Sequence, residues 1–477
     1  MPVYALADCN SFYASCEKAF NPQLKNRPVA VLSNNDGCVV SRSAEAKKLG
    51  IPMGAPAFKH EALFKANNVA VFSSNYALYG DMSARVMRTM ADMVPACEVY
   101  SIDEAFLRLD GLRGDMTAIC GKIRERVLRW TGIPISIGIG ETKTLAKAAN
   151  KLAKQSNGIF DLRGPDADEW LASLDVGDVW GVGPQYAKLL QSRRIHTSLD
   201  LKRADRVWIR KHMTVQGLQT VLELNGQPCI PMEQAPPPKK AICCSRSFGA
   251  YVRSLEGLRE AVASYATRAA EKLRGQDSVC SIVQVFIRTN PFKPEHRQHA
   301  ELAQATLSVA SDYTPDLLRA ALGILERLFR TGHAYQKAGV LLAGIEPKGS
   351  RQLSLIAPQP ADESKRGKAM AVLDAANRRY GRGALAYAAG GIEPEWGMKR
   401  EKLSPAYTTR WDQLLEVRGG DEGPFCVMTN CKHISPMRYE WDQNKRGNLE
   451  KHGIDFLDAI EVLEGSPLMR EDDRSDY

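Results

Sequence analysis

The chain has 477 residues, of which 44% are hydrophobic, and this length suggests about three or four domains rather than one core. No apolar run approaches the roughly 20 residues that cross a bilayer, and the start lacks a secretory signal, so we expect a cytoplasmic protein with no membrane partner. The net charge is +9, but residues 438–477 carry 6 basic and 11 acidic side chains, which leaves +14 on the rest. This excess suits a polyanionic partner, although charge alone does not separate nucleic acid from a solvated surface.

The first predicted elements form a small mixed lobe. Residues 3–7 are a short apolar strand that stops at Asp8, where a helix is expected to begin. A second strand over 28–34 leads through a turn and a further strand into a basic helix that ends at Gly50.

The next segment continues this mixture of helices and strands. Apolar spacing predicts a helix over 79–94, and residues 99–109 are expected to form a strand, a turn centred on 102–105 and a strand. The alternating run 132–140 predicts another strand, which a basic helix over 142–154 follows. The order favours an α/β or α+β core over a repeat array.

The second half begins with a helical region after residue 165. Residues 231–240 contain three successive prolines and form the clearest linker. A compact α+β module with two helices and several strands is expected from about residue 242, and the polar stretch 347–366 is interpreted as a tether.

Two neighbouring acids, Asp103 and Glu104, lie within a largely apolar run. Neighbouring side chains of a strand point to opposite faces, so these two carboxylates can share a ligand only at a turn or a strand end. Their mutual repulsion is tolerable if cations neutralise it, and hard oxygen ligands favour Mg²⁺ or Mn²⁺. Asp8 ends another apolar strand and is the natural third ligand, which gives a two-ion phosphoryl-transfer site. From these residues alone, a helix cap and two exposed turn acids remain an equal alternative.

Two basic segments could contact phosphate groups. The first contains Arg42, Lys47 and Lys48, and the second contains Lys143, Lys147, Lys151 and Lys154, whose spacing predicts one cationic stripe along a helix. Each segment alone is more simply explained as a solvated helix face. Beside a metal-binding acid cluster, a triphosphate becomes a sensible partner.

The run "VWGVGPQYAKLLQSRRI" is similar to the second half of a helix-hairpin-helix. Gly181 and Gly183 would let backbone N–H groups approach a phosphate at a helix N-terminus, where Lys188, Arg193 and Arg194 add positive charge. Such a motif holds a nucleic-acid backbone without selecting bases. A simple turn between helices is the alternative.

Several motifs together resemble the Y-family of DNA polymerases: "DCNSFYASCE", "FSSNYALYGDMS" and "YSIDEAF". The motifs "VWGVGP", "CSRSFG", "YQKAGV" and "LSPAYTTRWDQLLEVR" are more similar to the UmuC branch of that family, and the resemblance covers about residues 1–418. It implies an α+β multidomain, right-handed polymerase. The expected parts are a palm (1–25 and 81–165), fingers (26–80), a helical thumb (166–235), a little finger (242–345) and a partner-binding region (346–418).

The resemblance also implies roles for individual residues. Asp8, Asp103 and Glu104 match the palm ligands of two Mg²⁺ ions, for which Mn²⁺ could substitute, and the Cys9 carbonyl is a possible further ligand. Tyr13 matches the steric gate that excludes a ribose 2′-hydroxyl. The positions expected to contact the triphosphate are Ser41, Lys47 and Lys154, although Lys47 replaces a common arginine and Ala44 replaces a common tyrosine.

Two features near the C-terminus have their own resemblances. Gln352, Leu353, Leu355 and Ile356 are similar to a sliding-clamp-binding peptide, in which Ile356 replaces the usual aromatic residue. Residues 437–465 are similar to the start of a BrnT-type ribonuclease toxin, and we interpret 419–477 as a linker and an inactive fragment of such a protein.

The function that the resemblance implies is error-prone translesion synthesis in the SOS response, by template-directed deoxynucleotidyl transfer. The expected partners are primer-template DNA, deoxynucleoside triphosphates, a processed UmuD dimer, the RecA filament and the sliding clamp. Two alternatives remain: another two-metal nucleotidyl enzyme, or a DNA-binding accessory protein with an inactive palm.

Overall fold

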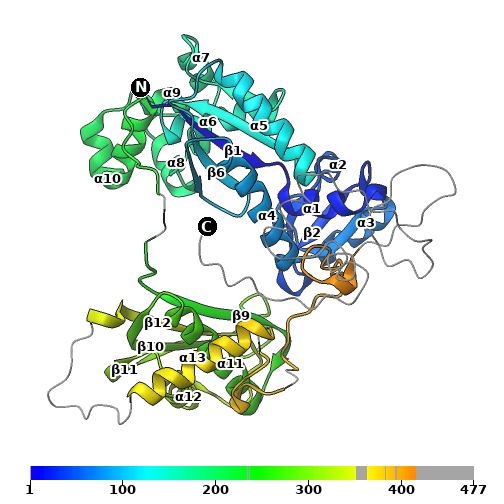
Figure 1. The fold of residues 1–477 in the computed structure, drawn as a ribbon, viewed down its shortest axis with the longest axis vertical. Helices are drawn as coiled ribbons and strands as arrows, with labels where there is room; N and C mark the ends of the chain where they lie inside the picture. The colour runs from blue at the N-terminus through cyan, green and yellow to red at the C-terminus, as the bar shows by residue number, and fades with distance from the viewer. Residues whose placement is uncertain are drawn as a thin grey trace, which may run out of the picture. The chain divides into compact units, whose positions relative to one another are not determined.

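A computed structural model describes residues 2–233, 235, 237–350, 363–381, 383–392 and 395–414 (Figure 1). These residues all belong to the first of two compact units, which spans 1–414. The described helices and strands build three separate sheets with helices packed against them. None of these helices has the length and apolar character that a bilayer-spanning segment needs.

The first sheet has five strands in the order β5-β6-β1-β7-β8. Its strands are β1 (Tyr4–Cys9), β5 (Ala96–Val99), β6 (Glu104–Arg108), β7 (Ile135–Gly140) and β8 (Ile159–Asp161). The central strand β1 is antiparallel to both β6 and β7, while β7 is parallel to β8. All six residues of β1 and of β7 are buried, which explains their nearly continuous apolar sequences.

Helices cover both faces of this sheet. They are α1 (Phe12–Phe20), α4 (Tyr76–Ala91), α5 (Met116–Thr131) and α6 (Lys143–Gln155). Side chains of α1, α4 and α5 share a core with Ala5 and Ala7 of β1, whereas Ala146 of α6 packs with Tyr4 and Leu6. A Cβ atom at Gly138 of β7 would lie 1.9 Å from the backbone nitrogen of Asn150, so glycine is required for α6 to pack this closely.

The second sheet has three strands in the order β3-β2-β4 and a small core of its own. Its elements are β2 (Val29–Leu32), β3 (Val39–Arg42), α2 (Ala44–Lys48), α3 (Glu61–Ala66) and β4 (Ala70–Ser73). The strand, turn, strand and basic helix expected before Gly50 are therefore all present.

A helical unit follows the first sheet, as expected after residue 165. Its helices are α7 (Ala167–Ala172), α8 (Pro184–Gln191), α9 (Ser198–Lys202) and α10 (Arg206–Leu224). Leu171, Leu190, Leu201 and Ile209 share a core with one face of α6, which connects this unit to the first sheet.

The third sheet is antiparallel, with the order β11-β10-β12-β9. Its elements are β9 (Ile242–Val252), α11 (Leu255–Arg274), β10 (Ser278–Thr289), β11 (Ala300–Ser311), α12 (Thr314–Leu328) and β12 (Tyr335–Pro347). The two helices pack on the sheet through a continuous apolar core, so the expected α+β module is confirmed. A further helix, α13 (Glu363–Arg379), contacts α11 through a bidentate ion pair between Asp374 and Arg274.

Residues 399–407, which we call the C-terminal segment, contact the second sheet and the ends of α1 and α4. The backbone N–H of Lys402 donates to Ser73 Oγ at 3.0 Å, and its carbonyl accepts from Ser73 N at 2.9 Å. The ring of Tyr407 stacks on Phe20 with centroids 4.9 Å apart. More than 300 residues of sequence thus separate this segment from the elements it contacts.

Candidate active site

Asp8 and Glu104 lie on the same face of the first sheet. Along β1, Tyr4 and Leu6 face α6, and the twofold alternation of a strand puts Asp8 on that face as well. On β6, Phe106 faces α6, so Glu104, two residues earlier, does too. Asp8 and Glu104 are also direct partners in the antiparallel register. The sheet therefore brings two carboxylates together where β1 ends and β6 begins.

A tight turn between β5 and β6 positions Asp103 next to these two acids. The N–H groups of Tyr100 and Ser101 both donate to the Glu104 carbonyl, at 3.0 and 3.1 Å. The Asp103 carbonyl accepts from Cys9 N at 2.8 Å, which ties the turn to β1. The turn was expected at residues 102–105, but it lies at 100–103, because Glu104 already pairs with Asp8 as the first residue of β6.

Ser101 stabilises this turn, and it was not among the predicted site residues. Its Oγ accepts from the N–H groups of Asp103 and Glu104 at 3.2 and 3.0 Å and donates to Asp103 Oδ1 at 2.6 Å. A serine that satisfies two turn N–H groups is a common local device, so a short polar residue two positions before the acids was the available signal.

Two lysines of α6 lie against the acids. Lys154 Nζ is 2.8 Å from Asp8 Oδ2, and Lys147 Nζ is 3.1 Å from Glu104 Oε2. Burial raises the pKa of Asp8 to about 6, Lys154 opposes this shift, and the neighbouring Glu104 carboxylate adds to it. Burial and the close approach of two carboxylates thus disfavour the ionised acids, and the two lysines compensate for their charge.

The prediction that the four lysines of α6 form one cationic surface is wrong. Lys143 is buried and pairs with Glu98 at 2.5 Å, while its Nζ also donates to the Pro231 carbonyl. Lys151 pairs with Asp178 before α8. Only Lys147 and Lys154 reach the acids, because the side chains of α6 face different neighbours around its circumference.

The donor set of this site fits a hard divalent cation. The side-chain donors are carboxylate oxygens, the ligands that Mg²⁺ and Mn²⁺ prefer. Burial raises the pKa of the Cys9 thiol well above its usual range, so its carbonyl rather than its thiol is the suitable donor. In the described part of the chain, however, no three acidic, Cys or His side chains converge as in a closed metal site. A cation held by all three acids would compete with the hydrogen bond from Ser101 to Asp103 and with the ion pairs to Lys147 and Lys154.

A cluster of cations lies beside the acids. Burial lowers the pKa of Lys47, and the nearby charges of Arg42 and Lys154 lower it further, whereas Asp8 opposes the shift. The Arg42 Nε and Nη1 atoms are buried and have no hydrogen-bond partner within the described residues. Unsatisfied guanidinium donors at this depth suit an anionic ligand. Arg42 belongs to a basic segment expected to contact phosphate groups, but it was not among the three positions predicted to contact the triphosphate.

The remaining predicted triphosphate contact, Ser41, already has two backbone partners. Its Oγ accepts from Ala14 N at 3.3 Å and lies 3.4 Å from the Ser11 carbonyl. Ser41 is buried, and Ser11 precedes α1 with a φ of 49°. In this structure Ser41 therefore holds the start of α1 against β3.

Tyr13 lies in the first turn of α1 and is part of an aromatic group. Its ring stacks on Tyr79 of α4 with centroids 4.4 Å apart and an angle of 13°. Tyr76 meets Tyr13 edge-on at 6.1 Å. Tyr13 is partly exposed while Tyr79 is fully buried, so the pair forms a supported aromatic surface near the acids.

The glycine-rich turn before α8 has the geometry that was expected from its sequence. Gly181 has a φ of 90°, in the region that favours glycine, and Gly183 is the N-cap residue of α8. Gly181, Gly183 and Lys188 are all exposed. The predicted clamp-binding residues Gln352, Leu353, Leu355 and Ile356, and the toxin-like residues 437–465, lie outside the described residues.

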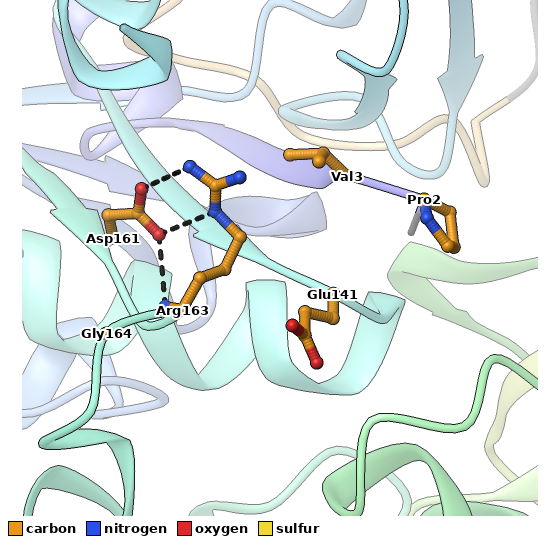
Figure 2. Close-up of a pocket in the computed structure, with 6 residues that line it drawn as sticks. All are labelled: Pro2, Val3, Glu141, Asp161, Arg163 and Gly164. Carbon is orange, nitrogen blue, oxygen red and sulfur yellow. Dashed lines mark hydrogen bonds and ion pairs between the residues drawn. The ribbon is translucent and has the colours of Figure 1, made fainter.

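A cavity of about 580 Å³ lies at the other end of β1 (Figure 2). Its lining includes Val3, Glu141 and Arg163, and Arg163 forms a bidentate pair with Asp161 at 2.9 and 2.6 Å. Because a strand rises about 3.3 Å per residue, Val3 is roughly 16 Å from Asp8. This cavity is therefore separate from the acid site.

Comparison with known proteins explains the combination of acids, cations and aromatic residues. Residues 7–151 match the impB/mucB/samB family, 239–355 match the C-terminal domain of that family, and 368–417 match a domain of unknown function. Protein UmuC of Salmonella typhimurium is 47% identical over 423 residues, which cover 87% of this chain and 100% of the relative. DNA polymerase IV of Pelotomaculum thermopropionicum is 36% identical over 204 residues, or 42% of this chain and 50% of that protein.

The fold also matches a solved structure. A chimera of the Y-family DNA polymerases Dbh and Dpo4 aligns with a TM-score of 0.58 and 20% identity over 72% of this chain and 99% of the chimera. This match confirms the expected Y-family polymerase fold. The chain therefore belongs to the impB/mucB/samB family and is a Y-family DNA polymerase of the UmuC type, which carries out error-prone translesion synthesis.

Proposed function

We propose that Asp8, Asp103 and Glu104 bind two Mg²⁺ ions at the site of nucleotidyl transfer, with the Cys9 carbonyl as a further ligand. When bound, the ions would lower the pKa of the primer 3′-hydroxyl and neutralise charge on the phosphates. Mn²⁺ suits the same oxygen ligands. The observation that carries this proposal is the register pairing of Asp8 with Glu104, which brings two carboxylates together. Burial raises the pKa of Asp8 and the Glu104 carboxylate adds to the shift, so a bound cation is favourable there.

The cations beside the acids would hold the incoming triphosphate. Arg42 and Lys47 would contact its outer phosphates, and Lys154 would move from Asp8 to the phosphate as the acids take up ions. The partnerless guanidinium atoms of Arg42 support this role. Ser41 would act mainly by holding α1, since its hydroxyl already contacts Ala14 and Ser11.

Tyr13 would lie under the deoxyribose and exclude a 2′-hydroxyl. Its ring is supported from behind by Tyr79, so it cannot move away without breaking that stack. The Tyr13→Ala variant is expected to incorporate ribonucleotides more readily, and single-nucleotide kinetics with matched deoxy- and ribonucleotides will measure the ratio. Unchanged sugar selectivity would refute the gate.

We assign the four polymerase parts by their sheets and cores. The palm would contain the first sheet (1–25 and 81–165), the fingers the second (26–80), the thumb the helical unit (166–235) and the little finger the third sheet (242–345). Gly181, Gly183 and Lys188 would grip the DNA backbone through exposed N–H groups and positive charge.

The partners beyond DNA and nucleotides follow from the relationship to UmuC. A processed UmuD dimer and the RecA filament would bind the region 346–418 during the SOS response, in the cytoplasm. Gln352, Leu353, Leu355 and Ile356 would contact the sliding clamp. The tail 419–477 would be a linker and an inactive toxin-like fragment without a part in synthesis.

Template-dependent primer extension tests the proposed reaction. The full-length protein, Mg²⁺ and deoxynucleotides would be incubated with a primer on a template that carries an abasic site, with and without processed UmuD and RecA. We expect the primer to extend past the site, and omission of the template to stop the reaction. Nucleotide consumption without a template would instead favour another two-metal nucleotidyl enzyme.

A further inference from the structure

The C-terminal segment places one buried hydroxyl between α1 and α4. Ser404 is 5% exposed and contacts Asn75 and Glu17, which are more than 300 residues away in sequence. Asn75 Oδ1 accepts from Leu78 N, so its Nδ2 must point to Ser404 and donate to Ser404 Oγ at 3.1 Å. Ser404 then has its own proton free to donate to Glu17 Oε1, at 3.0 Å.

Glu17 is a buried carboxylate that depends on hydroxyl donors. It is 1% exposed, and in the described part of the chain no lysine or arginine forms an ion pair with it. The same Oε1 atom that accepts from Ser404 also accepts from the Tyr79 hydroxyl at 2.6 Å. Burial raises the pKa of Glu17, and these two hydrogen bonds oppose the shift. Losing either donor would leave a buried acid half satisfied.

Tyr79 links this polar group to the nucleotide site. Its hydroxyl is fixed by Glu17, and its ring stacks on Tyr13. Tyr13 and Glu17 are four residues apart on α1, so they project from the same face of that helix. The position of Tyr79 therefore depends on contacts at both ends of its side chain.

The C-terminal segment also holds the first turn of α4. Asn75 is the N-cap residue of that helix, and its Nδ2 donates to the carbonyls of Ser404 and Pro405 at 3.1 and 3.3 Å. The turn that carries Tyr76 and Tyr79 is thus tied to residues near position 404. Removing these contacts would loosen the first turn of α4 and, with it, the ring of Tyr79 that stacks on Tyr13.

We propose that the C-terminal segment positions the sugar gate: Ser404 fixes Glu17 and Asn75, and these hold Tyr79 behind Tyr13. This inference rests on the proposed function of Tyr13. Ser404 and Glu17 are positioning residues, since both are buried and are proposed to act only through Asn75 and Tyr79. Part of the domain of unknown function at 368–417 would thereby contribute to nucleotide selection as well as to partner binding.

The test compares sugar selectivity in full-length variants. For Ser404→Ala, we expect the ratio of kcat/KM for a deoxynucleotide to that for its ribonucleotide to fall about threefold to tenfold, within the range of the net contribution of an ordinary hydrogen bond. Tyr79→Phe keeps the ring and removes the other donor to Glu17, so it should lower the same ratio. Arg410→Ala is the control, because its guanidinium pairs at the surface with Asp412.

The outcomes separate this inference from the gate itself. An unchanged ratio in Tyr13→Ala would overturn the gate and, with it, the positioning role. A lowered ratio in Tyr13→Ala with wild-type ratios in both Ser404→Ala and Tyr79→Phe would overturn only the positioning role. An equal loss of activity toward both sugars would indicate a purely structural contribution and would also overturn it. If Ser404→Ala does not fold, Tyr79→Phe decides alone.

Discussion

Asp8 and Glu17 are two buried carboxylates nine residues apart, and their hydrogen-bond and ion-pair partners differ in kind. Burial raises the pKa of both groups. Asp8 is the register partner of Glu104 and forms an ion pair with Lys154, which compensates for its charge. A metal ion could replace Lys154 at Asp8, and a phosphate could bind the released lysine. Within the described residues, the Glu17 carboxylate accepts only from the hydroxyl groups of Tyr79 and Ser404. We therefore expect the type of partner, rather than burial itself, to distinguish a metal-binding acid from a positioning acid.

The largest expected effect is that of Asp8→Asn. We expect primer extension to fall by about 10³-fold or more, as for the loss of a group that stabilises transition-state charge. The metal-free variant should nevertheless melt at a higher temperature than wild type at pH 7.5, because burial, and to a smaller extent Glu104, makes an ionised Asp8 unfavourable in the folded state. Calorimetry without metal checks the second result, and a lower melting temperature would contradict the electrostatic account.

A smaller effect is expected at the cation cluster. Arg42→Ala should raise the KM for deoxynucleotides about tenfold, because a charge-assisted contact to phosphate is lost, while DNA binding stays unchanged. Lys48→Ala is the matched control, since Lys48 is exposed on the neighbouring helix α2. Equal KM values for the two variants would remove Arg42 from the triphosphate site.

The pH dependence of metal binding follows from Asp8. Its pKa of about 6 exceeds the usual 3.8, so the metal-free folded protein holds more protons than the unfolded chain between these values. Stability of the metal-free protein should therefore decrease as pH rises through about 4 to 6. Metal binding needs the ionised form, so Mn²⁺ affinity should weaken up to about tenfold per pH unit below 6. Titrations from pH 5 to 7.5 measure this, and a flat profile would oppose the assignment of Asp8 as a ligand.

The smallest effect is expected for Glu17→Gln, which tests the contrast between Glu17 and Asp8. Glu17→Gln should reduce extension of deoxynucleotides only a few-fold and leave Mn²⁺ affinity unchanged, because Glu17 lies outside the metal site. The comparison with Asp8→Asn uses the same chemical change at two buried acids. A loss of metal binding in Glu17→Gln would show that the two acids are coupled and would break the distinction.

Local sequence patterns predicted much of the fold and the places of the three acids along the chain, although from these patterns alone a helix cap and exposed turn acids were an equal alternative to a metal site. Apolar alternation and the polar break after each strand predicted Asp8 and the pair Asp103 and Glu104 at strand ends. The turn was misplaced by two residues, because register pairing of Glu104 with Asp8 depends on a strand almost 100 residues away. Boundaries of this kind are set by tertiary contacts that a short window does not contain.

The supporting residues could not be predicted from the sequence for the same reason. Lys143 and Lys147 have similar local surroundings, yet one is buried against Glu98 and the other reaches Glu104. The burial of two Arg42 guanidinium atoms without a hydrogen-bond partner results from the packing of the folded chain, so the local sequence does not predict it. The contact between Ser404 and Glu17 joins residues 387 positions apart and has no local pattern.

The most direct measurement is primer extension by wild type and Asp103→Asn, made alongside their binding to primer-template DNA. Asp103 lies in the turn beside Asp8 and Glu104, and asparagine keeps its size while removing its charge. The account predicts that the variant binds DNA as tightly as wild type but does not extend the primer with Mg²⁺. Equal extension by the two proteins would contradict the assignment of these three acids as the catalytic site.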